Sequence, residues 1–160
     1  MTFPPPRTRI TSRAHFSAAH RLQNDAMEPE WNRRVFDKCN NPYGHGHTYV
    51  LEVTVEGDID AETGWVMDFK DLKRLIDERV VKPCDLRNLN SDVPFLAGIN
   101  PTAENLAVAI WKELEGNVAP ARLVRVVLHE TERNKVVYTG DAAPRGAAEI
   151  ASAKSPATAR

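Results

Sequence analysis

The sequence predicts an α+β fold in which an antiparallel four-stranded sheet carries two helices on one face, in the order ββααββ. Two observations support this prediction. Alternation of apolar and polar residues, typical of half-buried strands, occurs over 9–20, 45–55, 122–131 and 135–139. Apolar residues at helical spacing occur over 69–81 and 102–115. Two helices between two strand pairs favour a sheet with both helices packed on the same side.

The first two strands are separated by a long polar segment. Residues 22–42 hold Asn, Asp and two prolines, and loops of this length are uncommon in compact domains and often functional. Alternation returns at 45–55, and residues 57–64 read as a turn region. The second strand pair reads as a hairpin around Arg133 and Asn134.

Each predicted helix has a start and a stop signal. Asp68 is a suitable N-cap for the first helix, and Pro83 is expected to end it. Thr102 is a suitable N-cap for the second helix, which Gly116 is expected to end.

Composition predicts one soluble domain. The chain has 160 residues, of which 42% are hydrophobic and 27% charged, and its formal net charge is −1. Such a balance lacks the basic surplus of nucleic-acid-binding proteins. No run approaches the roughly 20 apolar residues of a membrane span, and the N-terminus lacks a signal-peptide core. We therefore expect a cytoplasmic protein with no nucleic-acid or membrane partner.

The domain is expected to occupy residues 9–140. Residues 1–8 are Pro-rich at their start, and residues 141–160 hold one large apolar side chain, Ile150. Such segments bury too little surface to offset their ordering entropy, so both are predicted to be disordered. The two cysteines, Cys39 and Cys84, are too few for a disulfide framework and are expected to be free thiols.

Three histidines share the apolar sides of the first two strands. His45 and His47 form an H-x-H pair, whose side chains point the same way in a strand, and His20 ends the apolar side of the first strand. If the strands pair, three imidazoles converge, which is the ligand set of a catalytic zinc site with one open position. The alternative is a set of hydrogen-bonded histidines at a sheet rim. His15 and His129 have polar parity and are expected at the surface.

Three further residues have both an ordinary and a functional interpretation. Cys39 is a fourth metal ligand, a small buried side chain, or a thiol made reactive by Lys38 and a metal. Glu130 continues an apolar face, so it either lies in water past the end of the strand or accepts two N–H bonds from a planar heterocycle at a pocket rim. Spacing alone favours a capping role for Thr102.

The motifs as a set resemble the 6-pyruvoyltetrahydropterin synthase family, to which 6-carboxytetrahydropterin synthase also belongs. The similarity covers roughly 9–140. The residues that carry it are Phe16-Ser17-Ala18-Ala19-His20, Cys39-Asn40-Asn41-Pro42-Tyr43-Gly44-His45-Gly46-His47, Thr63-Gly64-Trp65-Val66-Met67-Asp68, Asp85, Thr102-Ala103-Glu104-Asn105 and His129-Glu130-Thr131. The sequence of residues 39–42, Cys-Asn-Asn-Pro, is more similar to that of the pyruvoyl-forming branch.

This resemblance implies the tunnelling fold (T-fold), assembled as a homohexamer of two stacked trimers with active sites between subunits. It implies zinc (Zn²⁺) on His20, His45 and His47, and a pterin anchored by Glu130 with Thr102 nearby. The substrate it implies is 7,8-dihydroneopterin triphosphate, and the activity is that of a carbon–oxygen lyase. Cys39 would be the general base, assisted by a neighbouring Asp-His couple.

The chain departs from the family at that couple. The family pattern Leu-Asp-His corresponds to Cys84-Asp85-Leu86, so Asp85 is kept while the proton-carrying imidazole is replaced by Leu86. Cys84 is a replacement acid or a core filler. Ala103 also differs from the residue expected beside Thr102.

Three hypotheses follow: a zinc pterin synthase with an altered relay or product, a catalytically impaired pterin-binding protein, and a zinc-stabilised structural module with Cys39 as fourth ligand.

Overall fold

The computed structural model describes residues 6–140, so the predicted C-terminal tail 141–160 and residues 1–5 lie outside the described part. The strands are β1 (Arg7–His20), β2 (His45–Asp58), β3 (Arg87–Asn88), β4 (Arg122–His129) and β5 (Lys135–Tyr138). The α-helices are α1 (Pro29–Phe36), α2 (Phe69–Ile76), α3 (Lys82–Cys84) and α4 (Ala103–Leu114). Shorter helical turns are η1 (Asp37–Asn40), η2 (Asp77–Val81) and η3 (Pro94–Leu96).

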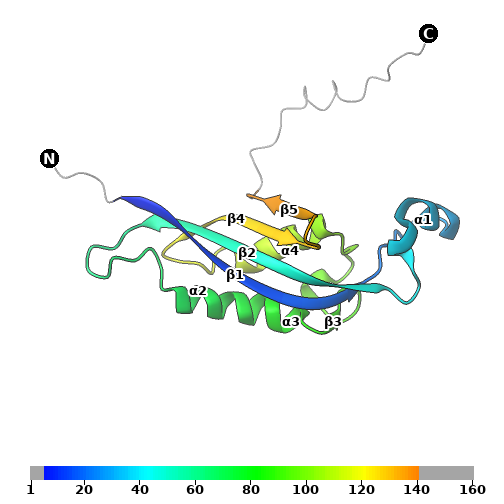
Figure 1. Cartoon of the computed structure of the whole chain (residues 1–160), viewed down its shortest axis with the longest axis horizontal. Helices are drawn as coiled ribbons and strands as arrows, with labels where there is room; N and C mark the ends of the chain where they lie inside the picture. The colour runs from blue at the N-terminus through cyan, green and yellow to red at the C-terminus, as the bar shows by residue number, and fades with distance from the viewer. Residues whose placement is uncertain (1–5, 141–160) are drawn as a thin grey trace, which may run out of the picture.

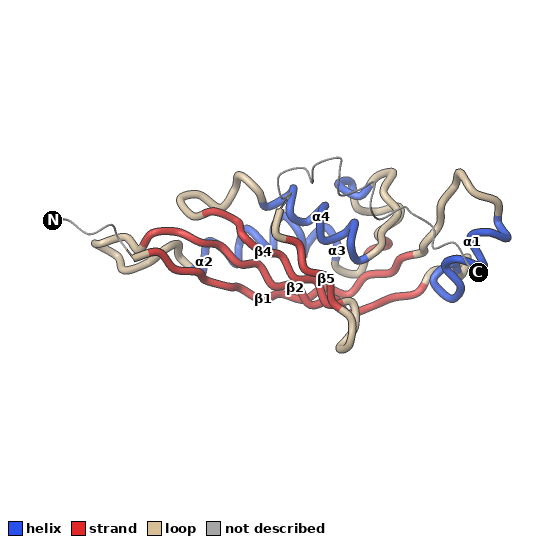
Figure 2. The backbone as a smooth tube through the Cα atoms, turned by 90° about the horizontal axis from the view of Figure 1, so that it is seen from above, coloured by secondary structure: helices blue, strands red, loops and turns tan. Residues whose placement is uncertain are grey.

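The sheet has the strand order β3-β1-β2-β4-β5. The four long strands pair antiparallel, as predicted, and the two-residue β3 adds a parallel partner at the end of β1. Helices α2, α3 and α4 lie on one face of this sheet (Figures 1 and 2). The predicted α+β arrangement is therefore confirmed, with β3 as an addition.

The core lies between the sheet and these helices. Strand side chains of one parity face it, because alternate residues of a strand point to opposite faces. Phe16 stacks on Tyr49 with ring centroids 5.1 Å apart. The largest fully buried apolar side chains are Phe16, Tyr49, Leu51, Leu72, Ile76, Leu89, Leu96, Leu106, Ile110, Leu114 and Leu128.

The segment predicted as one long loop contains a helix. Helix α1 begins at Pro29, which suits a first helical position, and runs straight into η1. The buried Asn32 amide ties this segment together, since its Nδ2 donates to the carbonyls of Asn24 and Met27 while its Oδ1 accepts from the backbone of Asn24. Helix α1 projects past the end of the sheet, beside the start of β2 (Figure 1).

Two boundaries differ from the sequence prediction. Strand β1 begins at Arg7, so residues 7–8 belong to the sheet and not to the predicted disordered N-terminus. Pro83 does not end the first helix, because the π-helical turn η2 carries it on into α3, where Pro83 occupies a first-turn position that needs no N–H donor. Among the described residues, no helix is long and apolar enough to cross a membrane.

Candidate metal centre

Strand register brings the three predicted histidines together. In the β1–β2 ladder His20 lies opposite His45, and Ala18 lies opposite His47. One ring nitrogen from each histidine lies within 4.8 Å of the others. The His20 and His45 Nε2 atoms are 3.1 Å apart. The predicted convergence of His20, His45 and His47 is therefore confirmed.

Hydrogen bonds to Nδ1 orient the His20 ring. His20 is 1% exposed, and its Nδ1 lies 2.8 Å from the backbone carbonyl of Pro101. A carbonyl only accepts, so Nδ1 carries the proton and Nε2 presents its lone pair to the other histidines. The Tyr49 hydroxyl lies 3.4 Å from the same Nδ1. A hydrogen bond to the ring nitrogen that does not bind the metal is the usual way in which proteins fix the tautomer of a metal-binding histidine.

The chemistry of the three imidazoles fits a metal ion. Burial lowers the pKa of His20 and also that of His47, so both rings favour the neutral form that binds metals. Ring nitrogens that face one another within 4.8 Å can all bind one cation placed between them. Three histidine ligands leave a fourth position for a substrate oxygen. The three histidines could therefore hold a metal.

Glu130 lies at the rim of the three-histidine centre. Strand β4 ends at His129, as the ordinary interpretation of Glu130 requires, yet the carboxylate turns toward the histidines. Its Oε1 is 3.8 Å from Nε2 of both His20 and His47, and its side chain is 24% exposed. No N–H or O–H group of the described residues forms a hydrogen bond to it, so its lone pairs remain available.

Cys39 lies in η1 and is half-buried. Its carbonyl accepts a 2.8 Å hydrogen bond from the backbone of Leu22, which holds η1 against the end of β1. Burial raises the pKa of its thiol, and the carboxylates of Glu130 and Asp37 raise it further. Lys38 is exposed and is not among the groups that shift the pKa of this thiol. Among described residues the converging ligand set is the three histidines without Cys39.

Thr102 and Asp85 occupy different places. Thr102 caps α4 by accepting from the Asn105 backbone at 3.2 Å, as its spacing predicts, and it follows Pro101 directly. Asp85 lies at the outer edge of β1, where Oδ1 accepts from the Ser17 backbone at 2.8 Å. Asp85 lines a cavity that contains neither Cys39 nor the metal-site histidines.

Leu86 and Cys84 flank Asp85 and have opposite environments. Leu86 is 84% exposed with a φ of 57°, a left-handed conformation that costs a non-glycine residue roughly 1–2 kcal/mol. Cys84 is fully buried in the core, and burial raises its pKa to about 12. It therefore packs as a core side chain and is a poor replacement acid.

Sequence reasoning missed two contributors to the site. The Tyr49 hydroxyl could have been suspected, because Tyr49 continues the parity of His45 and His47. The Pro101 carbonyl carries no sequence signal. His15 is exposed as predicted, and His129 lies on the outer face with Nε2 3.3 Å from Glu52.

Comparison with known proteins identifies the family. The family described as 6-pyruvoyl tetrahydropterin synthase matches residues 9–141. The chain belongs to this family. A 6-pyruvoyl tetrahydrobiopterin synthase of Poecilia reticulata is 47% identical over 132 residues, covering 82% of this chain and 90% of the relative. The solved 6-pyruvoyl tetrahydropterin synthase of Caenorhabditis elegans is 35% identical, with a TM-score of 0.81 over 88% of this chain and all of the other.

A second activity occurs among similar proteins. A dihydroneopterin monophosphate aldolase of Pyrococcus furiosus is 41% identical over 121 residues, covering 73% of this chain and 87% of the relative. The resemblance stated from the motifs is thus confirmed at the level of the family.

Burial of the His20 ring and partial burial of the His47 ring predict that the stability of the metal-free protein depends on pH. Unfolded imidazoles take up protons as the pH falls through about 6.5, while His20 and His47 resist protonation until lower pH. The unfolded state therefore binds more protons, so stability falls as the pH drops below about 6.5. Thermal melting of chelated protein between about pH 7.5 and about pH 5.5 measures this. His15→Gln, which removes an exposed ring, should leave the slope unchanged; a flat profile in the parent protein contradicts the prediction.

Proposed function

We propose that this chain is a zinc-dependent carbon–oxygen lyase acting on 7,8-dihydroneopterin triphosphate, of the 6-pyruvoyl- or 6-carboxytetrahydropterin synthase kind. The observation that carries the proposal is the convergence of His20, His45 and His47 beside the Glu130 carboxylate, which accepts no hydrogen bond from the described residues, in a member of this family. Three imidazoles with an open fourth position are typical of catalytic zinc.

Each residue has a role that its surroundings support. Zinc on the three histidines would supply a Lewis acid for the side-chain hydroxyls of the pterin and a positive charge near Cys39. Glu130 would accept two parallel N–H bonds from the pterin ring, with Thr102 nearby. Cys39 would remove a proton from the pterin side chain as general base.

Asp85 is proposed to act on the site of a neighbouring subunit. It lies at the edge of β1, and the cavity that it lines contains none of the three converging histidines of its own chain. Strand β1 pairs with β3 only at Ala18 and Ala19, so most of its outer edge has no strand partner in the described residues. Open edges favour pairing with another copy. The open edge supports association between copies, and we propose that the assembly is a homohexamer with active sites between subunits. Sedimentation of the purified protein measures its mass.

One observation favours a second candidate. Leu86 cannot transfer a proton, so the chain is alternatively a catalytically impaired pterin-binding protein. An aldolase acting on another pterin is also consistent, because the Pyrococcus relative carries that name. Tight pterin binding without turnover supports the first of these, and release of a shorter side chain from a dihydroneopterin phosphate supports the second.

Incubation of zinc-loaded protein with 7,8-dihydroneopterin triphosphate tests the proposal. We expect a defined pterin product whose mass identifies the branch. Cys39→Ala should lower turnover by roughly 10²–10⁴-fold, the usual effect of removing a general base. Its zinc content and melting temperature should match those of the parent, because the converging ligands are the three histidines. Loss of zinc from Cys39→Ala would instead indicate the structural four-ligand site, and an unchanged substrate over hours would overturn the lyase proposal.

A further inference from the structure

An imidazole lines the same cavity as Asp85, although position 86 itself does not supply one. This cavity has a volume of about 620 Å³ and runs along the outer edge of β1, where Asp85, Leu86 and His15 all line it. His15 is the only histidine among the described residues of its wall. A ring able to carry protons is therefore present on the strand beside the Asp85–Leu86 pair.

Two hydrogen bonds fix the position of the Asp85–Leu86 pair relative to His15. Oδ1 of Asp85 accepts from the Ser17 N–H at 2.8 Å, and the Leu86 N–H donates to the Ser17 carbonyl at 2.6 Å. His15 lies two residues before Ser17 in β1, so the two side chains point to the same face of the sheet, with Cα atoms roughly 7 Å apart. His15 is thus the next side chain along that face from the residue that anchors Asp85.

The His15 ring is free to exchange protons. Its side chain is exposed, and no hydrogen bond or ion pair within the described part of the chain involves the ring. An imidazole can accept a proton on one nitrogen near neutral pH and release it to water. Arg13 and Lys73 also line the cavity, but a cation of either type has no nitrogen that accepts a proton. Asp77 lines it as well and is paired with Lys82 at 2.9 Å.

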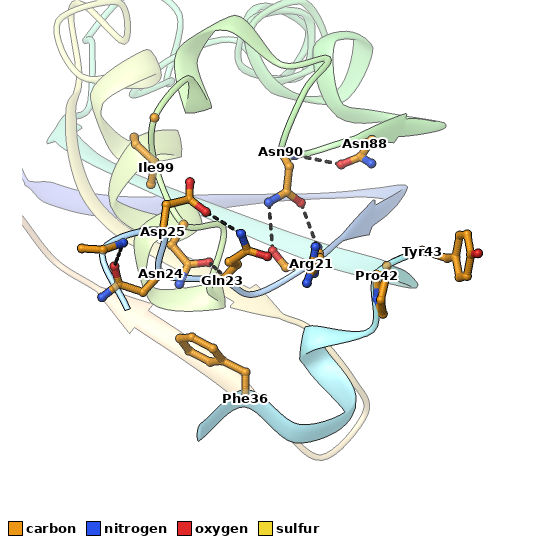
Figure 3. A pocket seen from close by; sticks show the side chains of 14 residues that line it. Arg21, Gln23, Asn24, Asp25, Phe36, Pro42, Tyr43, Asn88, Asn90 and Ile99 are labelled. Carbon is orange, nitrogen blue, oxygen red and sulfur yellow. Dashed lines mark hydrogen bonds between the residues drawn. The ribbon is translucent and has the colours of Figure 1, made fainter. Parts of the chain in front are cut away.

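The larger cavity beside the metal centre offers no such ring. It has a volume of about 760 Å³ and is lined by Arg21, whose backbone is held by the Asn90 side chain through hydrogen bonds of 2.8 and 2.9 Å (Figure 3). Neither a histidine nor Asp85 is among the described residues that line it. The ring that shares a cavity with Asp85 is therefore the one at the edge of β1.

We propose that His15 carries the proton that Leu86 cannot carry. This role rests on the proposed function, in which Asp85 acts on the site of a neighbouring subunit. One nitrogen of the His15 ring takes the proton from Sγ of Cys39 of the partner subunit and leaves a thiolate. The thiolate takes a proton from the pterin side chain and becomes a thiol again, while the exposed His15 ring passes its own proton to water.

His15 is a less precisely placed carrier than an imidazole at position 86. No described group holds its ring, whereas a ring at position 86 directly follows Asp85, whose Oδ1 is anchored. A positioned acid–base group contributes roughly 10²–10⁴-fold, so a ring that is not held in place should contribute less, about 10-fold. His15 therefore supplies proton transfer without removing the gain that an imidazole at position 86 would bring.

Kinetics of four zinc-loaded proteins with 7,8-dihydroneopterin triphosphate test this role: the parent, His15→Gln, Leu86→His and the double variant. His15→Gln should lower the kcat of the parent about 10-fold and leave KM, zinc content and melting temperature unchanged. In the Leu86→His protein the same substitution should change kcat less than about twofold, because the ring at position 86 then carries the proton. The matched control is His129→Gln, which changes a histidine on the same face of the sheet outside this cavity and should behave like the parent.

The other outcomes separate the role of His15 from the proposed function. Equal kcat for the parent and His15→Gln, or an equal loss in both backgrounds, overturns the role of His15 and leaves the lyase function standing. An inert parent beside an active Leu86→His variant also overturns the role of His15, while the chemistry of the site stands. If both proteins are inert with zinc bound, the lyase function is wrong and the role of His15 is wrong with it.

Discussion

Replacing His47 by alanine is expected to remove the metal and the activity together. The His47 ring is one of three that converge within 4.8 Å, and its side chain is 19% exposed. Changes to residues behind metal ligands already cost 10–100-fold in affinity, so loss of a ligand itself should cost more than about 100-fold. Metal content after dialysis and turnover of 7,8-dihydroneopterin triphosphate measure the two effects.

His129→Ala is the matched control for this experiment. His129 lies on the opposite face of the same sheet and hydrogen-bonds to Glu52. It should keep a full complement of metal and the activity of the parent. Because His47 is partly exposed, His47→Ala should still fold with the parent's circular dichroism. Full metal retention by folded His47→Ala would show that the three histidines are not the ligand set.

The positions of the histidines could be predicted because the period of a strand is two residues. His45 and His47 must share a face, and His20 continues the apolar side of its own strand, so pairing of the two strands was enough to bring them together. The same parity put Glu130 on an apolar face, where the sequence left open whether its carboxylate lies in water or at a pocket rim. Once β1 and β2 pair in register, the face on which each histidine lies in its own strand also decides which histidines meet.

Other parts of the site depend on contacts that no local pattern records. The Pro101 carbonyl reaches His20 only because the segment before α4 lies beside the end of β1. Helix α1 is short and its one buried side chain is the polar Asn32, while its apolar residues Trp31, Val35 and Phe36 are half-buried or exposed. It therefore lacks the buried apolar stripe by which a helix is predicted. The left-handed backbone of Leu86 is set by tertiary hydrogen bonds, since its N–H donates to the Ser17 carbonyl while Asp85 accepts the Ser17 N–H.

Restoring an imidazole at position 86 is expected to accelerate the reaction. Leu86 directly follows Asp85, whose Oδ1 is anchored by the Ser17 backbone, so Oδ2 remains available to orient a neighbouring ring. A positioned acid–base group contributes roughly 10²–10⁴-fold, so Leu86→His should raise kcat by an amount in that range. The substitution removes no core contact, because Leu86 is 84% exposed. Product formation under saturating substrate measures kcat.

Leu86→Asn separates proton transfer from backbone relief. Histidine and asparagine both adopt positive φ more readily than leucine, so both variants should fold at least as stably as the parent. Asparagine cannot transfer a proton, so its kcat should stay at the parent's value. Equal acceleration by both variants would assign the effect to the backbone. No acceleration by Leu86→His, with zinc bound and the oligomer intact, would mean that the parent already performs proton transfer through another group, and Leu86 would then not limit the reaction.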